Sequence, residues 1–201
     1  MRAVIICGGN VGEYINKYIE DGDFIICADS GYDRAKSCGI SPDIVIGDMD
    51  SVESRDLPEN KIVYPARKDF TDSELVVHYA LEHGFSDVLL FGMIGTRMDH
   101  TLANISLLEQ LKGINAVIID EYNEIYFAES EMTICGNIGD TISIIPFGGD
   151  AVGVTTSGLD YPLSGGVIKS GTSLGVSNMM TAESCSIKID KGTAFVIRSR
   201  D

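Results

Sequence analysis

Short apolar runs alternate with helix-like segments through the first 120 residues, and this alternation restricts the possible folds more than any other feature. The runs are continuously apolar, as in strands that are buried on both faces. Helix patterns, with apolar residues three and four positions apart, lie between them. The sequence therefore predicts an α/β domain with a mostly parallel sheet flanked by helices. The expected strands are 3–7, 24–28, 44–46, 61–64, 86–91 and 116–119, and the expected helices are 11–20, 32–38, 71–83 and 100–111.

The pattern changes near residue 123, after which the segments are short, strand-like and separated by glycine or Asx turns. Residues 141–144 and 186–190 alternate strictly between polar and apolar, as half-buried antiparallel strands do. The sequence Asp190-Lys191-Gly192 is typical of a hairpin turn. We therefore expect a second, all-β domain, a sandwich or a barrel, and divide the chain into 1–122 and 123–201. So small a β domain can complete its core by pairing with another subunit.

Composition limits the possible functions. The 201 residues are 44% apolar and 22% charged, which suits one or two soluble globular domains. The formal net charge of −15 argues against general nucleic-acid binding, because phosphates need a cationic surface. No apolar run approaches the roughly 20 residues of a membrane helix, and the apolar start is too short for a signal peptide. We expect a cytoplasmic protein that binds neither nucleic acid nor membranes.

Two aspartates directly follow the apolar run 44–46, in the sequence Gly47-Asp48-Met49-Asp50. Two carboxylates at the end of a buried strand repel one another unless a cation lies between them. The pair therefore predicts a Mg²⁺ site and, through Mg²⁺, a phosphate substrate. For this pair taken alone, an ordinary surface loop remains the alternative. Asp29 also follows a strand, and ligands of parallel sheets bind beyond the carboxyl ends of the strands.

The start of the helix at 71–83 has two interpretations. Thr71 and Glu74 form a capping box, and acids in a first turn complement the helix dipole. Capping explains these two residues fully, but it explains Lys68 and Asp72 less well. The functional hypothesis makes Asp72 a further metal ligand and Lys68 a phosphate partner.

A glycine turn at 92–95 precedes the helix at 100–111. Glycines let backbone N–H groups approach a ligand closely, and the following helix N-terminus attracts anions. Arg97 offers a planar fork for phosphate oxygens. A plain helix cap at Asp99 and an ordinary first-turn residue at His100 are the alternative.

Two loops of the second domain, 155–163 and 171–178, are rich in hydroxyl side chains. The second loop also contains glycines, so it could shape a pocket for a small molecule. Without other information, simple β turns with incidental hydroxyls are the favoured interpretation of both loops.

Six stretches in order along the chain resemble the thiamine pyrophosphokinase family. Together they run from about residue 28 to residue 178, so the resemblance covers most of the sequence. The stretches are Ala28-Asp29-Ser30-Gly31, Pro42-Asp43 with Gly47-Asp48-Met49-Asp50-Ser51, Lys68-Asp69-Phe70-Thr71-Asp72-Ser73-Glu74, Gly95-Thr96-Arg97-Met98-Asp99-His100, the segment 155–163, and Ser177-Asn178.

The resemblance implies a Mg²⁺-dependent enzyme that converts ATP and thiamine to AMP and thiamine diphosphate. It also implies a homodimer in which an α/β domain and a β-sandwich domain form active sites between subunits. By motif, the Mg²⁺ ligands would be Asp48, Asp50 and Asp72; the ATP-binding residues Asp29, Ser30, Lys68 and Arg97; the thiamine-binding residues Asp99, Ser177 and Asn178; and the catalytic residues Asp72, Arg97 and Asp99.

The chain departs from the family at a few positions. Met49 stands where phenylalanine is frequent, Gly175 and Val176 replace two hydroxyl residues, and tryptophan is absent. These changes bear on thiamine recognition rather than on the reaction. Two alternatives remain open: a phosphohydrolase with Asp48 as covalent nucleophile and Asp50 as acid/base, and a non-catalytic protein that binds nucleotide or thiamine.

Overall fold

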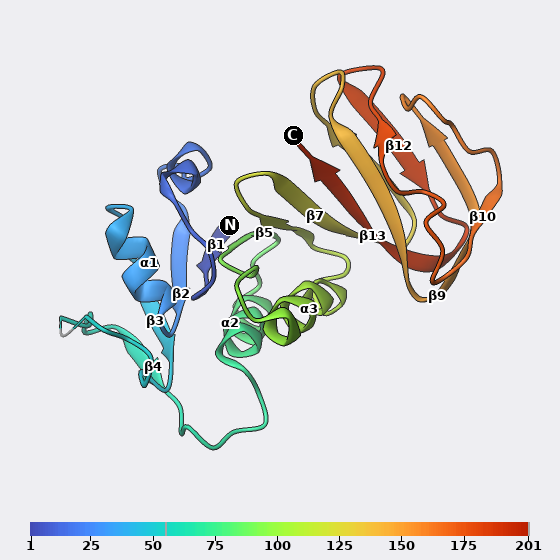
Figure 1. Ribbon diagram of the computed structural model, residues 1–201. Coiled ribbons are helices and arrows are strands. Elements are labelled where there is room, and N and C mark those ends of the chain that lie inside the picture. The colour runs from blue at the N-terminus through green and yellow to red at the C-terminus, as the bar shows by residue number, and fades with distance from the viewer. Residues whose placement is uncertain (55, 201) are drawn as a thin grey trace. The chain divides into compact units, whose positions relative to one another are not determined.

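The computed structural model describes residues 1–54 and 56–200. The chain forms two compact units, Met1–Glu121 and Tyr122–Asp201 (Figure 1). The first is an α/β unit and the second consists of strands, which confirms the expected two-part architecture. None of the helices in the described part of the chain combines the length and apolar character that a membrane-spanning helix needs.

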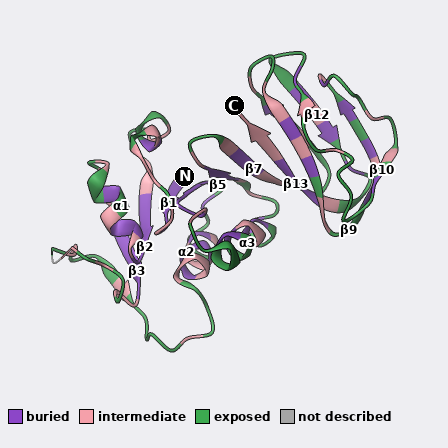
Figure 2. Cartoon of the chain, in the orientation of Figure 1, coloured by how far each residue is buried: buried purple, intermediate pink, exposed green. Residues whose placement is uncertain are grey.

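The strands of the first unit form one sheet in the order β4-β3-β2-β1-β5-β6. Every pairing between these neighbours is parallel. Most of the strand residues are buried, which explains their continuously apolar sequences (Figure 2). The strands are β1 (Arg2–Ile6), β2 (Phe24–Ala28), β3 (Ile44–Gly47), β4 (Lys61–Val63), β5 (Asp87–Phe91) and β6 (Asn115–Ile119).

The strand order reverses at β1, which pairs with β2 on one side and with β5 on the other. Such a reversal separates the loops that follow the two neighbouring strands and opens a crevice beyond their carboxyl ends. The turns after β1, β2, β3 and β5 all lie at this edge of the sheet, and they carry most of the residues expected to act.

The helices of this unit are α1 (Gly31–Ser37), α2 (Asp72–Glu82) and α3 (Met98–Ser106), with 3₁₀ turns η1 (Glu13–Lys17) and η2 (Leu107–Glu109). The helix expected at 11–20 is wrong: only η1 forms, and it buries Ile15 alone rather than an apolar stripe. The helix expected at 100–111 begins earlier and ends as an α-helix at Ser106, where η2 takes over. Thr71 caps α2 as predicted, because its Oγ1 accepts a hydrogen bond from the Glu74 N–H at 3.2 Å.

The second unit is built around one long strand, β9 (Thr141–Ser157), of 17 residues. Through Thr141–Val152 this strand pairs with β13, and through Thr155–Ser157 it pairs with β12. Its partners form the order β7-β13-β9-β12-β8, with β10 and β11 also against β9, and every pairing is antiparallel. The other strands are β7 (Asn123–Ala128), β8 (Glu131–Cys135), β10 (Gly166–Ile168), β11 (Asn178–Met179), β12 (Ser184–Lys188) and β13 (Lys191–Ser199).

The hairpin expected at Asp190-Lys191-Gly192 is wrong. The described pairings join β12 to β8 and β9, and β13 to β7 and β9. The connection is held by other segments, since the Ile189 N–H donates to the Ser130 carbonyl and the Asp190 N–H donates to the Val152 carbonyl. The chain therefore passes from one strand pair to another here instead of folding back on itself.

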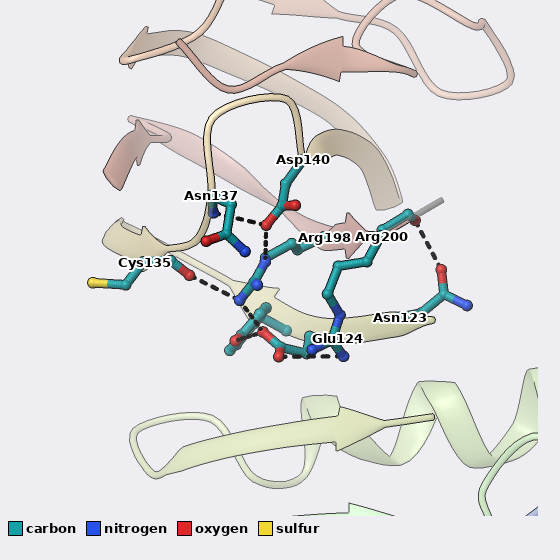
Figure 3. A network of polar contacts seen from close by, with 9 residues as sticks. Asn123, Glu124, Cys135, Asn137, Asp140, Arg198 and Arg200 are labelled. Carbon is teal, nitrogen blue, oxygen red and sulfur yellow. Dashed lines mark hydrogen bonds and ion pairs between the residues drawn. The ribbon is translucent and has the colours of Figure 1, made fainter. Parts of the chain in front are cut away.

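A buried ionic network joins three strands of the second unit (Figure 3). Arg198 on β13 lies 3.0 Å from Glu124 Oε2 and 2.8 Å from Asp140 Oδ2, and its side chain is 11% exposed. Its guanidinium also donates to the Cys135 carbonyl at 2.9 Å. Both carboxylates have further donors: the Tyr126 hydroxyl bonds Glu124, and the Asn137 N–H bonds Asp140. The charges are thus paired and hydrogen-bonded, as buried ions require.

Candidate active site

Three carboxylates meet at the crevice edge of the first unit. Asp29 follows β2, and Asp48 and Asp50 follow β3. One oxygen from each of the three side chains lies within 4.8 Å of the others. Asp29 is buried, Asp48 is half-buried and Asp50 is exposed, so the cluster extends from the protein interior to solvent.

The backbone around the cluster adopts conformations that side chains rarely accept. Asp29 has a φ of 47° and Met49 a φ of 64°, both in the left-handed region. Gly47 is needed for a different reason: a Cβ there would lie 3.0 Å from the Asp29 Cβ and 3.1 Å from Asp72 Oδ1. Such strained, tightly packed turns concentrate at functional sites.

Lys68 bridges two of the acidic side chains. Its Nζ lies 3.0 Å from Asp48 Oδ2 and 3.0 Å from Asp72 Oδ1, and its side chain is 12% exposed. Burial opposes the Lys68 charge, but the hydrogen bonds to Asp72 and Asp48 outweigh it and raise the Lys68 pKa. The hydrogen bond from Lys68 correspondingly lowers the pKa of Asp48. Of the three expected metal ligands, Asp72 is therefore paired with Lys68. The group of carboxylates that could hold a metal ion consists of Asp48, Asp50 and Asp29.

Asp29 has a buried Oδ1 atom that has no hydrogen-bond partner among the described residues. Burial raises the Asp29 pKa, and the negative charges of Asp72 and Asp48 add to that effect. An unsatisfied buried carboxylate oxygen is costly unless a cation or a donor binds it. Oxygen ligands from several carboxylates are what Mg²⁺ prefers, so the residues present fit a divalent cation.

A cavity of about 440 Å³ opens beside these carboxylates. Glycines from the turns after β1 and β5 line one side of it, namely Gly8, Gly9, Gly92 and Gly95. Ser30, Lys68 and Arg97, three of the residues expected to bind ATP, also line it. Close backbone approach is enforced at Gly9, where a Cβ would lie 2.3 Å from the Ile94 carbonyl oxygen.

Two buried polar side chains of α3, which the sequence did not single out, hold the turn after β5. Thr101 Oγ1 accepts a hydrogen bond from the Gly95 N–H at 3.1 Å. Asn104 Nδ2 donates to the Met93 carbonyl at 2.9 Å. The apolar spacing of this segment did not mark them, since Leu102 of that pattern is 61% exposed whereas Thr101 and Asn104 are buried and bonded to the turn.

Arg97 and Asp99 form an exposed ion pair at the start of α3. Arg97 Nε lies 3.2 Å from Asp99 Oδ1, and a second nitrogen bonds Oδ2. The hydrogen bond from Arg97, with help from the His100 N–H, lowers the Asp99 pKa to about 2. The Asp99 carboxylate is therefore a weak proton acceptor in this pair. It does not cap the helix either, since Arg97 occupies the N-cap position without a side-chain hydrogen bond.

The second unit has its own cavity of about 260 Å³, lined in part by Tyr161, Leu174, Ser177 and Asn178. Asn178 Oδ1 accepts from the Tyr161 N–H at 3.0 Å, and Asn178 Nδ2 donates to the Tyr161 carbonyl at 2.8 Å. Ser177 has a φ of 59°, and its N–H donates to Ser143 Oγ at 3.0 Å. Asn178 therefore fixes the backbone of the Tyr161 turn at the cavity wall.

Comparison with known proteins identifies the family. Residues 15–119 match the description "Thiamin pyrophosphokinase, catalytic domain", and residues 124–194 match "Thiamin pyrophosphokinase, vitamin B1 binding domain". The chain belongs to the thiamine pyrophosphokinase family. Its sequence is 33% identical over 211 aligned residues to the thiamine pyrophosphokinase of Bacillus subtilis, and the match covers 98% of both chains.

Solved structures of thiamine pyrophosphokinases are also similar. The crystal structure from Bacillus subtilis matches with a TM-score of 0.91 at 29% identity over all of both chains. The crystal structure from Geobacillus thermodenitrificans matches with a TM-score of 0.90 at 27% identity over 100% of this chain and 98% of that one. Membership in the thiamine pyrophosphokinase family favours a kinase over the phosphohydrolase and the non-catalytic binding protein.

Proposed function

We propose that the protein transfers the pyrophosphoryl group of ATP to the hydroxyl of thiamine, giving thiamine diphosphate and AMP. The observation that carries this proposal is the charged cavity of the first unit, bounded by Asp29, Asp48 and Lys68, in a chain of this family. The hydroxyl oxygen attacks the β-phosphorus, the bond from that phosphorus to the oxygen bridging it to the α-phosphorus breaks, and AMP leaves with that oxygen. The hydroxyl proton is released.

The acidic cluster would hold Mg²⁺ on the ATP phosphates. A triphosphate carries about four negative charges, so carboxylates alone would repel it, and Mg²⁺ reverses the sign of the local field. The family resemblance points to Asp48, Asp50 and Asp72 as ligands. The geometry supports Asp29 beside Asp48 and Asp50, with Asp72 acting through its ion pair to Lys68.

Positive groups and backbone amides would neutralise the phosphate oxygens. Lys68 presents an ammonium to the cavity from the segment before α2, and Arg97 presents a guanidinium from the start of α3. Ser30 and the glycine turns would supply further donors at the cavity wall. Phosphoryl-type transfer depends mainly on such positioning and charge neutralisation.

The thiamine site would involve residues of the second unit. Ser177 and Asn178 line a cavity in the residues that match the vitamin B1 binding domain. Asn178 would act there by shaping the Tyr161 turn. Asp99 would orient Arg97 or the thiamine, because its low pKa makes it a poor general base.

Each domain would have its own role in substrate binding, and the second would also mediate dimerisation. Residues 1–122 would form the ATP- and Mg²⁺-binding domain with its mostly parallel sheet, and residues 123–201 a β-sandwich that binds thiamine and mediates dimerisation. The enzyme would act as a cytoplasmic homodimer with active sites between subunits. Sedimentation velocity tests the dimer, and a monomer at micromolar concentration that retains full activity would contradict it.

The reaction is tested by incubating the protein with ATP, Mg²⁺ and thiamine and quantifying the products. We expect AMP and thiamine diphosphate in equal amounts, and neither product with EDTA or with the Asp48→Asn variant. Release of ADP or inorganic phosphate in place of AMP would contradict the proposal. A trapped phospho-aspartate on Asp48 would favour the phosphohydrolase.

A further inference from the structure

The two aspartates after β3 lie on a segment with little regular structure of its own. Residues 48–60 connect β3 to β4, and the described residues among them form neither helix nor strand. Local bonds hold its first part: the Asp50 N–H donates to Asp48 Oδ1 at 3.3 Å, and Ser51 Oγ donates to Asp50 Oδ1 at 2.8 Å. These bonds lie within the segment, and the Ser51 side chain also interacts with the Asp29 carboxylate, so the start of the segment is tied to Asp29 through Ser51.

Asp33, on helix α1, accepts two hydrogen bonds from the backbone of this segment. Its Oδ2 accepts a hydrogen bond from the Glu53 N–H at 2.8 Å, and its Oδ1 accepts one from the Ser54 N–H at 3.0 Å. One carboxylate thus binds two successive backbone amides, the strong charge-assisted form of the interaction. Burial opposes the Asp33 charge, but these hydrogen bonds outweigh it and lower the Asp33 pKa.

The helix that carries Asp33 is itself firmly placed. A Cβ at Gly31 would lie 2.0 Å from the Ile6 carbonyl oxygen, so the helix start packs directly on the backbone of β1. Ala35 is fully buried, and the Tyr32 hydroxyl donates to the Asp56 carbonyl at 2.7 Å. Because α1 starts two residues after Asp29, the same helix is tied to Asp29 by the chain and to the Asp50 segment by Asp33.

We propose that Asp33 is a positioning residue that sets the separation of the Asp29 and Asp50 carboxylates and thereby the affinity for the divalent cation. This inference rests on the proposed function of the acidic cluster. Metal sites tolerate only a few tenths of an ångström in ligand distance, so a segment freed at Glu53 and Ser54 weakens binding through Asp50. Asp33 is not among the residues that line the cavity, so it would act through the segment and not by contact with the cation or the substrate.

The test is Mn²⁺ binding in the presence of a non-hydrolysable ATP analogue, followed by the electron paramagnetic resonance signal of free Mn²⁺. Asp33→Ala removes both hydrogen bonds, and we expect the Mn²⁺ dissociation constant to rise about tenfold, which corresponds to about 1.4 kcal/mol. Asp33→Asn keeps one acceptor oxygen and should raise it about threefold. In steady-state assays the Mg²⁺ requirement and the KM for ATP should rise much more than kcat falls.

Lys36→Ala is the matched control, because Lys36 lies on the same helix and forms an ion pair with Asp56 whose side chains are 48% and 68% exposed. Its loss should leave the Mn²⁺ dissociation constant within twofold of the parent. Folded Asp33→Ala and Asp33→Asn proteins with the parent's Mn²⁺ affinity would overturn the inference. If instead the parent itself forms no thiamine diphosphate, the proposed function fails and not the positioning role alone.

Discussion

Lys68 of the first unit and Arg198 of the second each bridge two carboxylates, yet the two arrangements differ in their surroundings. Lys68 joins Asp48 to Asp72 with two 3.0 Å contacts. Arg198 joins Glu124 to Asp140 with contacts of 3.0 and 2.8 Å (Figure 3). Distances alone do not distinguish them.

The surroundings do distinguish the two networks. Each carboxylate around Arg198 receives a further hydrogen bond, and Arg198 also bonds a backbone carbonyl, so both carboxylates have more than one donor inside the unit. The group around Lys68 adjoins Asp29, whose buried Oδ1 has no partner, and it faces a cavity of about 440 Å³. A saturated network stabilises the fold, whereas an unsaturated one beside a cavity is prepared for a ligand.

The largest expected effect is a loss of catalytic activity when a carboxylate of the acidic cluster is removed. Asp50→Asn removes one negative ligand from the acidic cluster but leaves the fold intact, because Asp50 is exposed. We expect kcat/KM for ATP to fall by about 10³, or roughly 4 kcal/mol, as the charge that holds the cation is lost. Asp56→Asn, an exposed acid of the same segment, is the control and should retain parental activity. Near-parental turnover of Asp50→Asn at limiting Mg²⁺ would contradict the metal assignment.

The second largest effect is expected on the free energy of unfolding, when the Arg198 network of the second unit is disrupted. Arg198→Met leaves Asp140 buried without its ion-pair partner and leaves Glu124 with Arg200 alone, at 3.6 Å; loss of one partner of a buried pair costs about 3 kcal/mol. Urea unfolding should show this decrease in the free energy of unfolding, and Mg²⁺ should not restore it. The exposed Arg97→Met variant should unfold with the parental midpoint. If Arg198→Met were as stable as the parent, the saturated network would contribute nothing to the fold.

A smaller loss of stability is expected when Lys68 is replaced, and unlike the loss at Arg198 it should respond to Mg²⁺. Lys68→Met leaves Asp48 and Asp72 without their shared cation, and we expect the free energy of unfolding in EDTA to fall by about 1–2 kcal/mol. Mg²⁺ can replace the missing charge at the unsaturated cluster, so the variant should gain more thermal stability from Mg²⁺ than the parent does. Equal Mg²⁺ stabilisation of parent and variant would show that Lys68 and the cation do not share this cluster.

Much of the first unit could be predicted from sequence because its signals are local. The strand β3 is a continuous apolar run that ends at a glycine, so the position of Asp48 and Asp50 after it follows directly. The Thr71 cap is likewise encoded within four residues. The role of Asp29 was harder to assign, because its proximity to Asp48 depends on the pairing of β2 with β3.

The remaining features depend on contacts between distant residues. Asp33 and Glu53 are twenty positions apart, and the bond uses a backbone N–H that no side-chain pattern marks. The sequence pattern marks only the start of β9, residues 141–144, because Gly148 and Gly149 interrupt the strand pattern further along. The structure passes through these glycines with a shift in the register between β9 and β13, and such irregularities are fixed by the partner strand.

The smallest expected effect concerns the exposed pair at the start of α3. Asp99 has a pKa of about 2, below the usual 3.8, because Arg97 stabilises the charged form; it therefore stays ionised at every pH above about 4. A group that does not titrate adds no limb to a pH–rate profile between pH 5.5 and 9. Asp99→Asn should thus lower kcat/KM for thiamine by about tenfold or less, through the loss of Arg97 orientation, while the profile keeps its shape. His100→Gln is the control for substitution of a neighbouring residue, since His100 also lines the cavity. Loss of an acidic limb in Asp99→Asn alone would mean that Asp99 leaves Arg97 and accepts the thiamine proton when the substrates bind.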